Sequence, residues 1–169
     1  MTRVETVHGS FEAPAGWMLL EAGAAEGPLA EGAVRASIVV SGDLPIEGKS
    51  PAEYIAMQGV LLPELLPGYA PLEARTLSDD VWGPWLVHHR FEPTGDPALL
   101  QWQVYFFEVD RVGILTATGP AEAPGDLQAH LFRAMGTFAF PERGSAEHDQ
   151  LQDHAHHREE HQAQPAYQQ

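Results

Sequence analysis

The stretch LLQWQVYFFEVDRVGILTATG, from Leu99 to Gly119, constrains the fold of this chain more than any other feature. Two runs rich in aromatic and β-branched residues flank a tight polar turn at Asp110-Arg111, which predicts two antiparallel strands. Side chains alternate between the faces of a strand, so Trp102 points one way while Gln103 and Tyr105 point the other. The second face is therefore neither fully polar nor fully apolar, and it needs a physical explanation.

Two segments carry the signals of helices. In SPAEYIAMQGVLLPELL, Ser50 suits the N-cap, Pro51 suits the first helical position, and Glu53 completes a capping box. Pro63 is expected to end or kink this helix because it lacks a backbone N–H.

The second helical segment is PGDLQAHLFRAMG. Asp126 is the expected N-cap, and Gly136 marks the C-terminal end. Leu127, Leu131 and Met135 recur at helical spacing and predict the buried stripe.

Strand-like runs surround the two helices. They lie at residues 2–12, 17–22, 33–41, 72–77 and 82–91, with a loop of small residues expected at 23–32. Together with the hairpin that begins at Leu99, they predict an α+β fold in which helices pack on an antiparallel β-sheet.

The chain divides near residue 143. Residues 1–143 are expected to form one domain, whereas residues 144–169 are polar, rich in Gln and His, and nearly free of large apolar groups. Such a segment cannot bury enough surface to offset its ordering entropy, so we expect a disordered tail.

Composition excludes several function classes. The net charge of -15, with only 9 Lys and Arg among 169 residues, argues against nucleic acid and anionic membranes as partners. The sequence contains no cysteine, no apolar run long enough to span a membrane and no recognisable signal peptide, so we expect a cytoplasmic protein without membrane insertion. Neither a nucleotide-binding glycine loop nor a Ser/His/Asp pattern is present, and we expect no enzyme activity and no cofactor.

Histidines offer the only other candidates for chemistry. His88 and His89 are adjacent on a predicted strand, so they point to opposite faces and cannot bind one metal together. In the tail, His157 and His161 have the i, i+4 spacing of a metal pair, but nothing orders them and we expect no functional metal site.

If the helices cover one face of the sheet, the other face is left for water, a second copy or a ligand. The residues assigned to that face mix small, apolar and amide side chains: Ser37, Val39, Ser41, Gln101, Gln103, Tyr105, Phe107, Gly113, Leu115 and Ala117. This mixture suits an apolar helix, because small residues leave room for its side chains and amides pair its polar atoms. The alternative is that the strand phase is shifted by one residue and these residues are core.

The order and spacing of several segments resemble the DcrB-like branch of the PsbP/Mog1 fold. The segments are GSFEAPAGW (9–17), ASIVVSGD (36–43), SPAEYIAMQGVLLPELLPGY (50–69), WQVYFF (102–107) and GILTATGP (113–120). The resemblance covers residues 9–140 and is greatest to the cytoplasmic Eag-type, effector-associated chaperones of bacterial type VI secretion.

The resemblance implies a function and a binding site. Such chaperones are homodimers that shield the hydrophobic N-terminal transmembrane helices of a secreted effector before export. The implied client-binding groove comprises Ser37, Val39, Gln58, Gln103, Tyr105, Leu115 and Ala117. A PsbP/Mog1-like protein-binding module with a different partner is the alternative.

Overall fold

The computed structural model describes residues 2–21, 23–28, 34–45 and 47–143. The predicted disordered tail, residues 144–169, and its histidines lie outside the described residues. The helices are α1 (Pro51–Leu65) and α2 (Leu127–Met135). The strands are β1 (Thr2–Glu5), β2 (Ser10–Ala13), β3 (Met18–Leu20), β4 (Ala24–Glu26), β5 (Ser37–Asp43), β6 (Ala70–Thr76), β7 (Trp85–Phe91), β8 (Leu99–Phe107) and β9 (Val112–Pro120).

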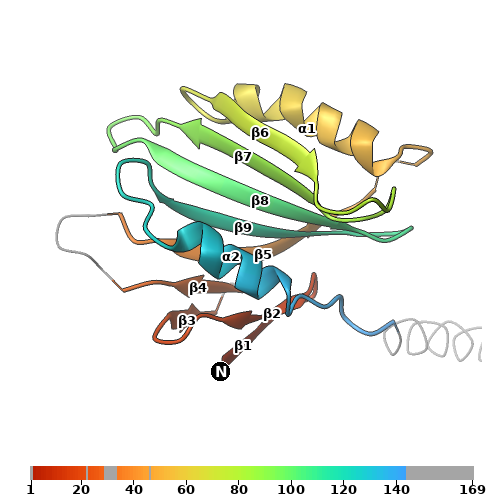
Figure 1. Cartoon of the computed structure of the whole chain (residues 1–169), viewed down its shortest axis with the longest axis horizontal. Coiled ribbons are helices and arrows are strands. Elements are labelled where there is room, and N and C mark those ends of the chain that lie inside the picture. The colour runs from red at the N-terminus through yellow and green to blue at the C-terminus, as the bar shows by residue number, and fades with distance from the viewer. Residues whose placement is uncertain (1, 22, 29–33, 46, 144–169) are drawn as a thin grey trace, which may run out of the picture.

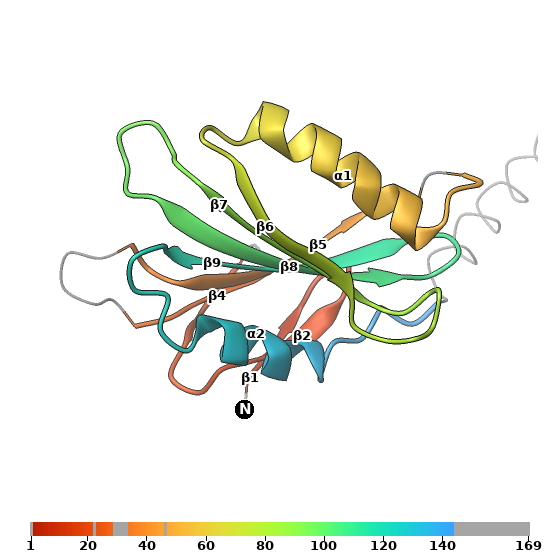
Figure 2. The same ribbon diagram turned by 45° about the horizontal axis from the view of Figure 1, so that its top comes forward.

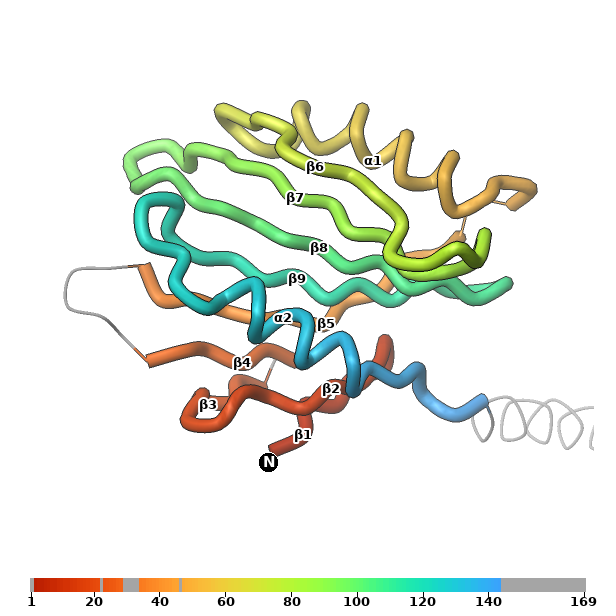
Figure 3. Tube along the Cα trace, in the orientation of Figure 1, coloured from red at the N-terminus to blue at the C-terminus, as the bar shows by residue number. Residues whose placement is uncertain are grey.

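Within the described ranges, seven of the strands form one antiparallel sheet in the order β3-β4-β5-β9-β8-β7-β6 (Figure 1). The predicted hairpin β8–β9 is its centre, and the tube in Figure 3 shows these two long strands running through the middle of the molecule. Strands β1 and β2 form a separate two-stranded hairpin. The predicted α+β class with an antiparallel sheet is confirmed.

The two helices lie on opposite faces of the sheet, with α1 above and α2 below in Figure 2. The expectation that one face would carry both helices is therefore wrong. Sequence patterns give the apolar stripe of each helix but not the side of the sheet on which it packs. We call the two sides the α1 face and the α2 face.

The larger core lies on the α2 face. Leu127 and Leu131 of α2 pack there against Val104 and Leu115 of the sheet, and Phe11 of the β1–β2 hairpin joins them. Leu115 is 0 % exposed. Burial of each such side chain stabilises the fold by roughly 1.5–3 kcal/mol.

The groove assignment of Leu115 and Ala117 is corrected by this packing. Val104 is paired with Leu115 and Trp102 with Ala117, so these residues share the α2 face and not the face of Gln103. Both are buried beneath the chain's own elements. The alternative phase, shifted by one residue, is the correct one for β9.

Glycines on β9 make this packing close. A Cβ at Gly113 would lie 2.5 Å from Cζ of Phe138, and one at Gly119 would lie 2.7 Å from Cδ2 of Leu127. The small residues that suggested space for a guest helix therefore make room for α2 and the segment that follows it.

The capping box of α1 forms as predicted. The Ser50 hydroxyl accepts from the Glu53 N–H, and the Glu53 carboxylate accepts from the Ser50 N–H at 2.8 Å. Pro63 lies within α1, which continues to Leu65, so the helix does not end at the proline. Asp126 precedes α2 but its side chain makes no capping hydrogen bond.

Strand β4 was missed, because its alanines are poor strand formers. Gly23, with φ of +74°, turns the chain after β3. Strand β4 then pairs with β3 on one side and with β5 on the other, which places Ala24 and Ala25 in the sheet, where both are buried.

Leu115→Ala is expected to lower the free energy of unfolding by roughly 2–5 kcal/mol, since it opens a cavity in a packed core. Thr116→Ala, its neighbour on the α1 face, is the matched control and should change stability by less than about 1 kcal/mol. Urea denaturation followed by circular dichroism measures both. Equal losses would show that the assignment of faces is incorrect.

Candidate functional site

The α1 face is only partly covered. At one end of the face, Tyr54 and Ile55 of α1 pack against Val87, Tyr105 and Val112, all of which are buried. Farther along this face, side chains of β5, β8 and β9 are half-buried: Ser37, Val39, Gln101, Gln103, Thr116 and Thr118. We call these six residues the open patch.

Register explains why they lie together. Val39 is paired with Thr116, and Thr116 with Gln103, so one row crosses β5, β9 and β8. A second row joins Ser37, Thr118 and Gln101 in the same way. Residues paired across neighbouring strands point to the same side of a sheet.

The structure brings most of the predicted groove residues to this side. Ser37, Val39 and Gln103 belong to the open patch, and Tyr105 lies buried beside them. Gln58 lies on the sheet-facing stripe of α1, because it falls one turn from both Tyr54 and Leu62, which are buried. As reported above, Leu115 and Ala117 lie on the opposite face.

Sequence reasoning missed Ile114, Thr116 and Thr118, which take the places assigned to Gly113, Leu115 and Ala117. Both alternating sets of β9 contain apolar and small residues, so hydrophobicity alone does not fix its phase. The β-branched set Ile114, Thr116, Thr118 was the available signal, because such residues favour half-buried sheet surfaces.

Exposed apolar residues border the open patch. Met18 and Leu20 of β3 share its side of the sheet through their pairing with Glu26 and Ala24, and they are 50 % and 38 % exposed. On α1, Leu61 follows Tyr54 by seven residues, which places it on the same side of the helix, and it is 43 % exposed. The open patch therefore lies between two apolar borders.

The two glutamines of the open patch are held by hydrogen bonds. His89 Nε2 lies 3.0 Å from Gln101 Oε1, and Gln101 Nε2 donates to Thr118 Oγ1 at 3.0 Å. With the Gln101 oxygen facing the ring, His89 donates through Nε2. The Tyr105 hydroxyl donates to Gln103 Oε1 at 2.8 Å.

Charge is nearly absent from this side of the sheet. Tyr54 donates to Asp43 Oδ2 at 2.6 Å, and Glu26 pairs with Arg35, so the carboxylates at its borders have partners. Burial, together with Asp43, raises the pKa of Tyr54, and burial raises the pKa of Tyr105. Both phenols stay neutral at physiological pH.

The adjacent histidines point to opposite faces as predicted. His88 stacks on Trp102 on the α2 face, with ring centroids 4.4 Å apart, whereas His89 is fully buried on the α1 face near Tyr69. Across the described ranges, no three His, Asp or Glu side chains gather in a way that could hold a metal. Among the same residues, no helix has both the length and the apolar character needed to cross a membrane.

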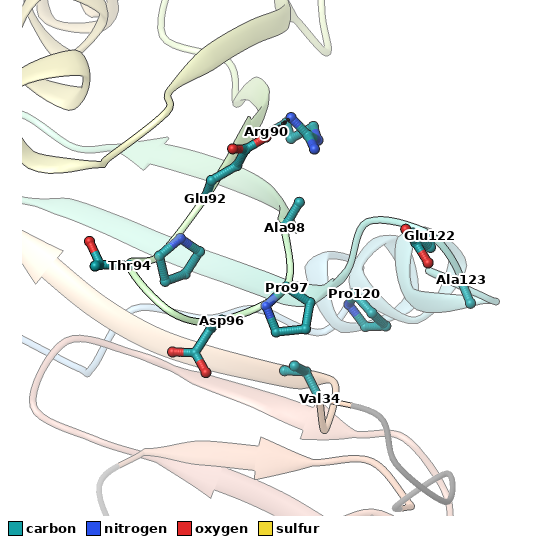
Figure 4. Close-up of a pocket in the computed structure, with 11 residues that line it drawn as sticks. Val34, Arg90, Glu92, Thr94, Asp96, Pro97, Ala98, Pro120, Glu122 and Ala123 are labelled. Atoms are coloured by element: carbon teal, nitrogen blue, oxygen red, sulfur yellow. Dashed lines mark hydrogen bonds and ion pairs between the residues drawn. The ribbon is translucent and has the colours of Figure 1, made fainter.

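Two hollows lie near these elements. A groove of about 500 Å³ separates α1 from β6 and is lined by Ile55, Gly59, Tyr69 and Val87, among others. A larger hollow of about 780 Å³ lies at the β7–β8 loop, where Figure 4 shows Thr94 and Pro97 with charged side chains at its edge. Prolines and charged side chains line it, including the Arg90–Glu92 ion pair.

The buried His89 predicts an acid-sensitive fold. Burial lowers its pKa to about 4, from about 6.5 in an unfolded chain, while the hydrogen bond to Gln101 acts in the opposite direction. Between these values the unfolded chain binds a proton that the folded chain does not, so stability falls as pH drops from 6.5 to 4. The slope is at most about 1.4 kcal/mol per pH unit.

Urea midpoints measured between pH 7.5 and 4.5 test this dependence. The wild type should lose stability over this range, and His89→Gln should show a flatter dependence whatever its stability at pH 7.5. Parallel curves for the two proteins would contradict a neutral buried His89.

Comparisons with known proteins support the fold. No protein-family model matches the chain, and no curated protein matches its sequence. A crystal structure of PA94 from Pseudomonas aeruginosa, described as a protein of unknown function and putative regulator, superposes with a TM-score of 0.62 at 22 % identity, covering 85 % of this chain and 99 % of that one. LpqN, described as involved in cell envelope biogenesis of Mycobacterium tuberculosis, superposes with a TM-score of 0.55 at 17 % identity, covering 76 % of this chain and 80 % of that one. At these identities the similarity establishes a shared fold.

Proposed function

We propose that this chain is a binding protein that shields an apolar helix of a partner on the open patch. The observation that carries the proposal is the chemistry of that patch: a neutral, half-buried sheet surface of small, apolar, hydroxyl and amide side chains between two apolar borders. A surface adapted only to water would carry charged side chains such as Lys and Glu.

The energetics of such a complex are favourable. An apolar helix outside a membrane exposes a large hydrophobic area, and burying it stabilises a complex by roughly 25 cal/mol per Å² before the cost of association. The neutrality of the patch matters because a charge beneath a bound apolar helix would lose its hydration without a partner.

The resemblance to the effector-associated chaperones supplies the finer proposal. The partner is then the N-terminal transmembrane segment of a type VI secretion effector, bound in the cytoplasm before export. The protein acts by binding, without a catalytic centre or a cofactor. The net charge of -15 is consistent with a protein partner, because it disfavours nucleic acid and anionic lipid surfaces.

The alternative is a binding module of the same fold with a different partner. LpqN has the same fold and is described as involved in cell envelope biogenesis, and this description favours the alternative. A neighbouring gene that encodes a large protein with N-terminal membrane segments and a secretion-spike domain favours the chaperone. Its absence favours the alternative.

Thr116→Arg should weaken binding of an apolar helix by at least tenfold, since it places an unpaired charge at the centre of the open patch. Thr94→Arg, in the exposed β7–β8 loop, is the matched control and should leave affinity unchanged. Fluorescence anisotropy with a labelled 20-residue apolar peptide in 0.5 M NaCl measures both. Failure of the wild type to bind the peptide, or equal binding by Thr116→Arg, would contradict the proposal.

We also expect a homodimer. Several large apolar side chains are exposed, among them Met18 and Leu65, and Leu65 is 72 % exposed. Exposure of such side chains to water is unfavourable, and apolar surface of this kind is typical of sites that bind other chains. Light scattering at micromolar concentration without a partner should give twice the mass of one chain. A monomer mass would remove this part of the proposal.

A further inference from the structure

Strand β6 forms a free edge of the seven-stranded sheet. It pairs with β7 on one side, and no other strand among the described residues pairs with its outer side. With seven residues it is longer than β3, the three-residue strand at the opposite edge. Residues 71–76 are all exposed. An exposed edge of this length presents backbone N–H and C=O groups to which another chain can add a strand.

The register shows which backbone groups are free. The Leu77 N–H donates to the Pro84 carbonyl at 2.7 Å. This bond lies one position beyond the pair of Thr76 with Trp85. Hydrogen-bonded and non-hydrogen-bonded pairs alternate along an antiparallel ladder. Because Leu77 bonds toward β7, the N–H and C=O groups of Thr76 and Ala74 point to the open side.

The features that usually block an edge affect only part of β6. Pro71 lacks an N–H, and the register shifts between Pro71 and Glu73, so regular pairing is restricted to residues 73–76. Within that stretch, Glu73 and Arg75 neutralise each other in an ion pair of 2.6 Å. Both side chains lie on the α2 face, opposite to that of Ala74. The open edge therefore carries no uncompensated charge on its α1 side.

On the α1 face, this edge borders the groove of about 500 Å³ between β6 and α1, which run alongside each other in Figure 2. Ile55 and Val87, each 6 % exposed, line it with apolar surface. A Cβ built on Gly59 of α1 would meet open space among the described residues. Ala74 is paired with Val87 and lies on the same side of the sheet. A residue added opposite Ala74 therefore directs its side chain toward the groove.

The elements around the groove carry a negative charge. Residues 50–76 contain three glutamates, Glu53, Glu64 and Glu73, against the single cation Arg75, which leaves a formal charge of -2. The whole chain carries -15. A partner segment with basic residues is therefore favoured electrostatically over an acidic one.

From the free edge, the groove and this charge we infer that β6 binds an extended, basic segment of a partner protein as an additional strand. The segment runs antiparallel to β6, as the other strand pairs described in this sheet do. It places an apolar side chain in the groove opposite Ala74 and carries Lys or Arg toward its ends. This surface is separate from the open patch and adds a second mode of binding to the proposed function.

Backbone hydrogen bonds give such a complex a specific pattern. The partner residues opposite Ala74 and Thr76 each exchange two bonds with β6, whereas the residue between them directs its N–H and C=O groups to solvent. The residues that bond to β6 are also those whose side chains point to the α1 face. Removing N–H groups from one alternating set of the partner must therefore abolish binding, and removing them from the other set must not.

Fluorescence anisotropy with labelled peptides tests this pattern. The first peptide has nine residues, with alternating Val and Thr and an Arg at each end. The second is N-methylated on its Val residues and the third on its Thr residues, so that each lacks the N–H donors of one set. The fourth has Glu in place of Arg.

The wild type should bind the unmodified peptide and the peptide with N-methylated Thr with similar affinity. N-methylation of Val, the set expected to face the groove, should weaken binding by at least about tenfold, since it removes bonds to β6. The peptide with Glu should bind more weakly in 50 mM NaCl, and the difference should shrink in 0.5 M NaCl.

Two pairs of protein variants connect binding with β6 and the groove. Ala74→Pro removes an N–H that faces the open edge, where proline is tolerated, and should weaken binding about fivefold or more. Ala74→Ser keeps the N–H and should bind as the wild type does. Gly59→Leu should fill the groove and weaken binding without lowering the urea midpoint, because glycine is a poor helix former. Gly59→Ala, its control, should raise the urea midpoint and keep most of the affinity.

Other results would overturn the inference. If N-methylation weakens binding equally for both sets, or for neither, the peptide does not pair as a strand. If Ala74→Pro and Gly59→Leu both keep full affinity, the peptide binds elsewhere. If the wild type binds no peptide, or if Ala74→Pro turns a dimer of this chain into a monomer in light scattering, β6 does not serve a basic segment of another protein. Binding of an apolar helix to the open patch, tested with Thr116→Arg, stands or falls separately.

Discussion

The antiparallel pairing of β8 with β9 is the interaction on which the rest of the structure depends. Its register, from Leu99 with Pro120 to Phe107 with Val112, joins the two longest strands over their full length. Because side chains alternate strictly across a strand, this register divides the residues of the chain between two faces of very different character. A shift of one residue would exchange Leu115 for Thr116 and place polar groups in the core.

The two faces are used differently. On the α2 face, Leu127 and Leu131 of α2 complete a core with the β1–β2 hairpin, and glycines of β9 allow the close approach. On the α1 face, a single helix packs at one end, held by Tyr54 against Tyr105 and by the Tyr54–Asp43 hydrogen bond. The remainder keeps neutral, half-buried side chains, among them two glutamines that are hydrogen-bonded to buried residues.

Buried polar groups give this surface its order. His89 and Tyr105 are nearly inaccessible, yet each is hydrogen-bonded to a half-buried glutamine. Such buried polar groups stabilise the fold while they keep a hydrogen-bond partner, because a buried polar group left unpaired costs free energy. The same bonds therefore pair buried polar groups and order the glutamine side chains of the open patch.

The sequence by itself determined the antiparallel sheet, the β8–β9 hairpin, the capped start of α1 and the opposite directions of His88 and His89, because alternation, turn chemistry and capping are local. Only the tertiary structure decided the phase of β9, the pairing of β4 and the placement of the helices on opposite faces. Both alternating sets of β9 contain apolar and small residues, so only its pairing with Val104 and Gln103 separates Leu115 from Thr116. The candidate surface follows from that pairing, which no single segment of the chain contains.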